Sequence, residues 1–218
     1  MAARIQVGII GLGKFGLAFG KALVDLGQEV MGIDSDMDNV RRAQDILTQV
    51  YQADGAEKKA LEQLGFSDMT HVMVSVGGSI EASAMISLYL KELDVANVWV
   101  KAISADHEKL LRKIGVTEVI FPERYAANQL ANKLAVPGLI EYLPFGQDVA
   151  LIELMVSRWD GKTLRELALT SKYGVQIIAV RKAGEERFGF IPKADEPLRK
   201  GDALVVIGQR SSFTDLKS

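Results

Sequence analysis

The N-terminal part of the chain alternates short apolar runs with amphipathic stretches. Residues 5–10 form a nearly continuous apolar run, which is typical of a strand buried on both faces of a parallel sheet. Similar runs recur at 29–33, 50–53, 71–76, 98–102 and 119–121. Between them, apolar residues recur at helical spacing over 15–26, 38–47, 57–64, 80–93 and 107–114. This alternation predicts an α/β fold with a Rossmann-like, doubly wound parallel sheet.

The pattern changes after a helical stretch at 123–135. Proline and glycine punctuate the chain at 137–138 and 144–146. Strand-like runs then follow at 149–156, 175–180 and 203–207, and helical stretches at 164–171 and 211–217. We therefore expect two domains, a Rossmann domain with a crossover helix over 1–136 and a small α+β domain over 137–218.

Composition narrows the class of protein. The chain has 218 residues, of which 48% are hydrophobic and 25% charged, as in globular proteins. A net charge of −2 without a basic stripe argues against nucleic acid as a partner. The lack of cysteine excludes disulfides and thiolate metal sites. No apolar run approaches the roughly 18 residues of a membrane span, and the first residues lack a signal peptide, so we expect a cytoplasmic protein whose membrane role would come through a partner.

A Gly-x-Gly-x-x-Gly motif, Gly11 to Gly16, separates the first predicted strand from the first helix. In a Rossmann fold such glycines permit a tight turn, close approach of phosphate and close helix–strand packing. Asp34 ends the second predicted strand, near the spacing of about 20 residues expected for a carboxylate that binds ribose hydroxyls. Its charge would repel a 2′-phosphate, which disfavours NADP. A glycine turn followed by a chance aspartate is the competing interpretation.

Other candidate residues follow the predicted strands, whose carboxyl ends share one edge of the sheet. The candidate nucleotide-binding residues are Gly11, Gly13, Lys14, Phe15, Gly16, Asp34, Ser35, Asp54, Gly55, Val76, Gly77, Lys101 and Glu123. Each charged candidate also has a structural interpretation. Lys14 would then be an exposed lysine at a helix start, Lys101 half of a structural ion pair, and Glu123 a carboxylate favoured by a helix dipole.

Catalytic machinery is not evident in the sequence. The two histidines, His71 and His107, open a strand and begin a helix, and no serine nucleophile motif occurs. We therefore interpret the site as one that binds a nucleotide without transforming it, so that the protein is not an enzyme. An NAD-dependent oxidoreductase stays an alternative, as does a stand-alone sensor such as a transcription factor, although no helix-turn-helix or basic patch supports the latter.

The ordered motifs resemble those of the RCK (regulator of potassium conductance) proteins of the KtrA/TrkA type, with TrkA-N and TrkA-C domains. The similar segments are 7–16, 32–34, 51–55, 76–83, 90–93, 98–102, 113–115, 121–124, 161–164 and 198–202. The resemblance implies a cytosolic gating subunit of a potassium uptake system. Its homodimers would assemble into an octameric ring beneath a KtrB- or TrkH-like membrane subunit. ATP and ADP would compete for the Rossmann site, with NAD or NADH as alternative ligands, and ATP would favour potassium flux.

The resemblance also implies finer roles. Glu123 would help hold a divalent cation, magnesium or calcium, at the terminal phosphate near a dimer interface. Lys14 stands where the family often has an arginine that reaches the γ-phosphate in the neighbouring subunit, and Asp54 stands where asparagine is common. The C-terminal domain would bind a regulatory ligand, cyclic di-AMP in some members. A variant of this hypothesis keeps the family and changes the partner to another cation transporter or antiporter.

Overall fold

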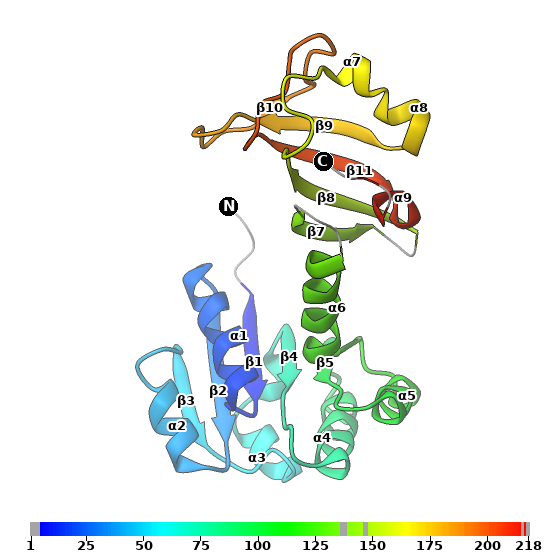
Figure 1. Cartoon of the computed structure of the whole chain (residues 1–218). Helices are drawn as coiled ribbons and strands as arrows, with labels where there is room; N and C mark the ends of the chain where they lie inside the picture. Colours follow the sequence, from blue (N-terminus) through cyan, green and yellow to red (C-terminus); the bar gives the residue numbers. More distant parts are fainter. Residues whose placement is uncertain (1–4, 136–138, 146–147, 215, 217–218) are drawn as a thin grey trace. The chain divides into compact units, whose positions relative to one another are not determined.

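The computed structural model describes residues 5–135, 139–145, 148–214 and 216, with the backbone alone for 139–145 and 214. The chain divides into two compact units, Met1–Pro122 and Glu123–Ser218, and each is described by itself (Figure 1). The two divisions differ in helix α6 (Pro122–Ala135). The expected boundary after residue 136 places it in the first domain, whereas the structure places all but its first residue in the second unit. Residues 136–138, where the sequence predicts the boundary, lie outside the described residues.

The first unit is built on a six-stranded parallel sheet, which confirms the predicted fold class. The strands are β1 (Gln6–Ile10), β2 (Glu29–Asp34), β3 (Gln49–Gln52), β4 (His71–Val74), β5 (Asn97–Lys101) and β6 (Glu118–Ile120). They are ordered β3-β2-β1-β4-β5-β6. The order therefore reverses between β1 and β4, and in open α/β sheets ligands bind outside the carboxyl ends of the strands at such a point.

Helices connect these strands along the chain (Figure 1). They are α1 (Lys14–Asp25), α2 (Met37–Ala43), α3 (Lys58–Gln63), a 3-10 turn at Phe66–Asp68, α4 (Ile80–Glu92) and α5 (Ala105–Ile114). Successive residues of β1 join different cores, because side chains alternate between the faces of a strand. Ile9 packs with Leu47, whereas Ile10 packs in the cluster that contains Ile86. Burial on both faces explains the continuous apolar run in β1.

The second unit holds a five-stranded antiparallel sheet in the order β10-β9-β11-β8-β7. Besides α6, its elements are β7 (Leu139–Phe145), β8 (Val149–Met155), α7 (Leu164–Leu167), α8 (Leu169–Tyr173), β9 (Gln176–Arg181), β10 (Gly189–Phe190), β11 (Ala203–Gln209) and α9 (Arg210–Thr214). The α+β class predicted for this part is confirmed.

Three elements of the second unit differ from what the sequence predicts. No element was expected over 139–143 and a turn was expected at 144–146, but residues 139–145 form β7, and this edge position tolerates Pro144 because the ladder on one side of an edge strand is unpaired. The short strand β10 was not predicted at all. The single helix expected over 164–171 is two helices, because Ala168 adopts a left-handed conformation with φ +48° between them.

Candidate functional site

The glycine loop joins β1 to α1 at the point where the strand order reverses. Gly11 has a φ of +95°, and its N–H donates to the Ile33 carbonyl at 2.9 Å. A Cβ on Gly11 would lie 2.8 Å from the backbone carbon of Ser75, and one on Gly16 would lie 2.0 Å from the Gly11 carbonyl oxygen. A Cβ on Gly13, by contrast, would meet nothing within 4 Å. Gly11 and Gly16 are therefore needed for the loop itself, whereas Gly13 leaves open space above it.

The first turn of α1 has no side-chain cap. Gly13 is the N-cap residue, and it cannot supply a side-chain acceptor. In the same unit, Asp36 caps α2, Ser79 caps α4 and Ser104 caps α5. The N–H groups at the start of α1 are thus left for another acceptor, and together with the helix dipole they favour an anion. Lys14, the first residue of α1, is exposed beside them.

Asp34 is the last residue of β2, and its carboxylate is held by three donors. Oδ2 accepts from the Leu12 N–H at 2.7 Å and from the Asn39 side-chain amide at 3.0 Å. Oδ1 accepts from the Asp36 N–H at 2.9 Å. The bond to Leu12 connects the carboxylate directly to the glycine loop, so the two parts of the motif are in contact.

A pocket of about 350 Å³ opens beside the loop and Asp34. Its lining comes from the carboxyl ends of β1 to β4, from α2 and from the first two turns of α4. The lining residues are Ile10, Gly11, Gly13, Ile33, Asp34, Ser35, Asn39, Ala53, Asp54, Gly55, Ser75, Val76, Gly77, Gly78, Ser79, Ala82 and Ile86. The structure therefore brings together eight of the sequence candidates, namely Gly11, Gly13, Asp34, Ser35, Asp54, Gly55, Val76 and Gly77.

The remaining candidates lie outside this lining, as far as the described residues define it. Lys14, Phe15 and Gly16 belong to the first turn of α1. Lys101 ends β5, and its ammonium group lies 5.8 Å from the centre of the Phe15 ring, at cation–π distance. Glu123 is exposed in the first turn of α6 and belongs to the second unit. Its role stays a prediction.

Sequence reasoning missed several polar and apolar lining residues. Asn39 on α2 and Ser75 after β4 belong to no nucleotide-binding motif, so only the folded chain reveals them. Ala82 and Ile86 lie one helical turn apart on α4, and this i, i+4 spacing was the available signal that they share a face. Gly55 also has a packing reason, since a Cβ there would lie 2.5 Å from the Ile10 side chain.

Two carboxylates, those of Asp34 and Asp54, line the pocket, and no lysine or arginine among the described residues does. Asp54 Oδ1 accepts from the Ala56 N–H at 2.9 Å, which closes the turn after β3. Near the start of α4, a backbone hydrogen bond and the Ser79 hydroxyl lower the pKa of Glu81. An anion at this site would therefore be attracted chiefly by the backbone N–H groups of α1 and by the exposed Lys14.

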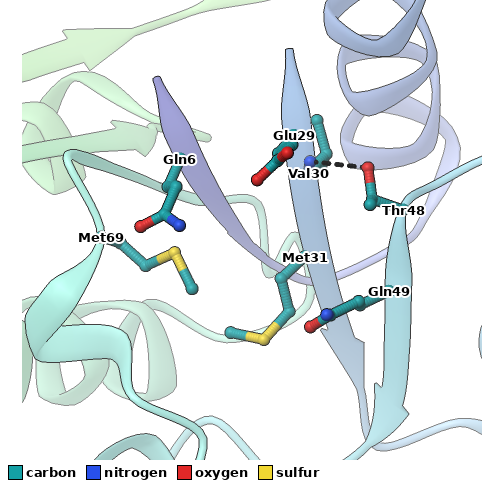
Figure 2. Close-up of a pocket in the computed structure, with 7 residues that line it drawn as sticks. All are labelled: Gln6, Glu29, Val30, Met31, Thr48, Gln49 and Met69. Atoms are coloured by element: carbon teal, nitrogen blue, oxygen red, sulfur yellow. Dashed lines mark hydrogen bonds between the residues drawn. The ribbon is translucent and has the colours of Figure 1, made fainter. Parts of the chain in front are cut away.

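Two other hollows are separate from this pocket. A cavity of about 80 Å³ lies at the opposite, amino-terminal edge of the same sheet, and Gln6, Met31 and Met69 are among its lining residues (Figure 2). The second unit has a pocket of about 460 Å³ between α7, α8 and the start of β9. Within the part of the chain that the structure describes, no cluster of three His, Cys, Asp or Glu residues gathers as a metal site. None of its helices is long and apolar enough to cross a bilayer.

Comparison with known proteins identifies both parts of the chain. The TrkA-N domain family matches residues 7–122, and the TrkA-C domain family matches residues 151–218. The chain is 36% identical to the Ktr system potassium uptake protein C of Bacillus subtilis, over 97% of this chain and 94% of that protein. It is 34% identical to the Ktr system potassium uptake protein A of Vibrio alginolyticus, over 98% and 97% of the two chains.

Solved structures show the same fold at lower identity. The RCK domain of GsuK superposes with a TM-score of 0.65 at 18% identity, covering 97% of this chain and 46% of that one. The GsuK channel bound to NAD gives a TM-score of 0.64 at 19% identity, with 97% and 38% coverage. This chain thus spans less than half of those larger proteins. Its relatives are transport proteins rather than enzymes, as the sequence predicts. The chain belongs to the TrkA-N/TrkA-C (RCK) family of Ktr and Trk potassium uptake proteins.

Proposed function

We propose that this chain is a regulatory subunit that binds an adenine nucleotide and thereby controls a membrane potassium transporter. One observation carries the nucleotide part: a single pocket combines the uncapped N-terminus of α1 with the Asp34 carboxylate. The first suits phosphate and the second suits ribose hydroxyls. The GsuK structures bound to NAD and to ADP support the same assignment by analogy of fold.

The proposed ligands are ATP and ADP, with NAD and NADH as alternatives. A ligand shifts a conformational equilibrium only by its different affinities for the two states. ATP and ADP differ in the γ-phosphate, so the residues that distinguish them must lie where that group points. Lys14 and Glu123, with a magnesium or calcium ion, are the candidates that the resemblance gives. Lysine lacks the forked donor geometry of arginine, so this contact would be weaker than in relatives with arginine.

Nucleotide binding, without hydrolysis, would shift the subunit between its two conformational states. A tenfold preference of ATP for the transport-competent state supplies about 1.4 kcal/mol per site. Homodimers assembled into an octameric ring would multiply this bias over several sites. We place the ring at the inner face of the membrane, against a KtrB- or TrkH-like potassium-translocating subunit. The pocket of the second unit is the candidate site for a further regulatory ligand such as cyclic di-AMP.

Calorimetric titration of the full chain tests the nucleotide assignment. ATP, ADP, NADH and NADPH are compared with and without magnesium, in the unaltered chain and in Asp34→Ala. We expect ATP and ADP to bind, NADPH to bind less tightly because Asp34 repels its 2′-phosphate, and Asp34→Ala to weaken the binding of ATP. Tight binding of NADPH alone would contradict the role given to Asp34.

Transport assays test the regulatory part. The chain is produced with a candidate membrane subunit in cells that lack their own potassium uptake, and growth is measured at limiting potassium. Co-purification and nucleotide-dependent potassium flux are the expected results. ATP hydrolysis that rises and falls with flux would contradict switching by binding alone. A putative Na⁺/H⁺ antiporter of Bacillus subtilis is 30% identical to this chain over 74% of its residues. Growth is therefore also measured at several sodium concentrations, because a dependence on sodium would favour an antiporter as the partner.

A further inference from the structure

Asn39 lies in the candidate nucleotide pocket, yet no phosphate-binding or ribose-binding motif includes it. It sits on α2, in the first turn after the Asp36 cap, whose carboxylate accepts from the Asp38 N–H at 2.8 Å. The beginning of α2 is therefore fixed, and with it the direction of the Asn39 side chain. That side chain is half-buried and reaches Asp34 at the end of β2.

The orientation of the Asn39 amide is set by a second residue. The Arg42 guanidinium, one turn further along α2, donates to Asn39 Oδ1 and also donates to the Asp38 carbonyl. An arginine can only donate, so the oxygen of the Asn39 amide must face it. The Nδ2 group then faces Asp34, where it donates to Oδ2 at 3.0 Å. The chain Arg42–Asn39–Asp34 thus has one consistent direction of donation.

This contact restricts which acceptor positions of Asp34 stay open. A carboxylate offers about four lone-pair positions. Leu12 N–H and Asn39 Nδ2 take two on Oδ2, and Asp36 N–H takes one on Oδ1. Among the described residues, Asn39 supplies the only side-chain donor to this carboxylate. Without it, the Asp34 carboxylate would keep its two backbone donors but would be freer to rotate about its last torsion.

We propose that Asn39 is a positioning residue that orients the Asp34 carboxylate so that an open position on Oδ1 faces the ribose hydroxyls of the nucleotide. The proposal rests on the proposed function, because it assumes that an adenine nucleotide occupies the pocket. Asn39 acts through Asp34 and leaves the phosphate end of the site to the α1 backbone.

Replacement Asn39→Leu tests the role directly. Leucine has a higher helix propensity than asparagine, so α2 should persist. ATP and 2′,3′-dideoxy-ATP carry the same adenine and phosphates and differ in the two ribose hydroxyls alone. Because the Asp34 carboxylate would then be freer to rotate and would bind the ribose hydroxyls less well, we expect the Kd for ATP to rise about five- to tenfold. The Kd for the dideoxy nucleotide should change by less than about twofold, since it makes no bond to Asp34.

Two further variants sharpen the result. Gln44→Leu removes an exposed amide from the C-terminal end of the same helix and should leave both affinities unchanged. Asn39→Asp keeps the shape but places a second negative charge against Asp34, so it should weaken ATP binding more than Asn39→Leu does. Thermal unfolding without nucleotide shows whether each variant is folded.

The outcomes separate the two proposals. Equal losses for ATP and for 2′,3′-dideoxy-ATP in Asn39→Leu would overturn the positioning role and leave nucleotide binding intact. Unchanged or tighter ATP binding in that variant would also overturn it. Failure of the unaltered chain to bind ATP, ADP or NADH would overturn the proposed function, and the positioning role with it.

Discussion

At the scale of single residues, the three glycines of the loop differ in why the position is a glycine. Gly11 needs its positive φ, and Gly16 has no room for a Cβ because the Gly11 carbonyl lies in the way. Gly13 has a φ of −64° and a ψ of −170°, which any residue adopts, and it has open space around it. The first two positions therefore maintain the fold, whereas the space beside Gly13 at the start of α1 is open.

This difference predicts opposite results for two matched substitutions. Gly16→Ala should lower the free energy of unfolding by about 1–3 kcal/mol, because the backbone must shift to relieve the contact. Gly13→Ala should change it by less than about 1 kcal/mol, because the reduced freedom of the unfolded chain and the loss of a favourable N-cap residue act in opposite directions, yet it should weaken ATP binding by filling the space where phosphate would approach the α1 N-terminus. Urea unfolding and calorimetry check the pair. Normal ATP binding by a folded Gly13→Ala variant would contradict phosphate binding at this position.

At the scale of elements, α5 carries a buried histidine. His107 is 1% exposed, and its Nδ1 accepts from the Ile103 N–H at 3.4 Å. Its Nε2 atom finds no hydrogen-bond partner among the described residues. Burial lowers the pKa of His107 below its ordinary value, because the charged ring loses its hydration. The first turn of α5 therefore holds a histidine that is stable in its neutral form.

The stability of the chain should consequently depend on pH through this residue. As the pH falls, the unfolded chain takes up a proton at His107 near pH 6.5, before the folded chain does. The contribution of the neutral, buried His107 to the free energy of unfolding is therefore complete above about pH 6.5 and is lost as the pH falls below it. Urea unfolding at several pH values checks this. We expect the decline below that pH to be smaller in His107→Gln than in the unaltered chain. Identical pH dependence of the two proteins would contradict it.

Some elements of the fold could be predicted from the sequence and others could not. The parallel sheet and the Gly11–Asp34 motif were predictable because burial on both faces and a tight phosphate turn leave strong local patterns. Strand β7 was missed because Pro144 is tolerated only by an edge position, which the sequence does not reveal. The break at Ala168, whose φ is +48°, was missed because alanine is a strong helix former and gives no local signal of a helix end. Asn39 was missed because its role depends on where α2 begins and on Arg42 beside it.

At the scale of the whole molecule, the two units have separate cores and separate sheets. The candidate pocket for the nucleotide is lined entirely from the first unit, among the residues that the structure describes. A ligand stabilises the part of a protein to which it binds in the folded state. Nucleotide binding should therefore stabilise the first unit more than the second.

Hydrogen exchange of the full chain, followed by mass spectrometry, checks this expectation. At an ATP concentration about 100 times its Kd, the added stability should be about 2.7 kcal/mol for the unit that binds it. We expect slower exchange across β1, β2 and β4, with β8, β9 and β11 unaffected in the isolated subunit. The Asp34→Ala variant serves as the control that binds weakly. Equal protection of both sheets would indicate that the units unfold together.

The bond from the Leu12 N–H to Asp34 has a consequence for how the site would respond in a cell. Because this bond joins the loop to the carboxylate, ATP and ADP would compete for one common set of contacts. When the concentration of each nucleotide exceeds its own dissociation constant, the fraction of sites that hold ATP depends on the ratio of the two concentrations and hardly on their sum. A subunit of this design would follow the energy charge of the cell rather than the size of its adenylate pool.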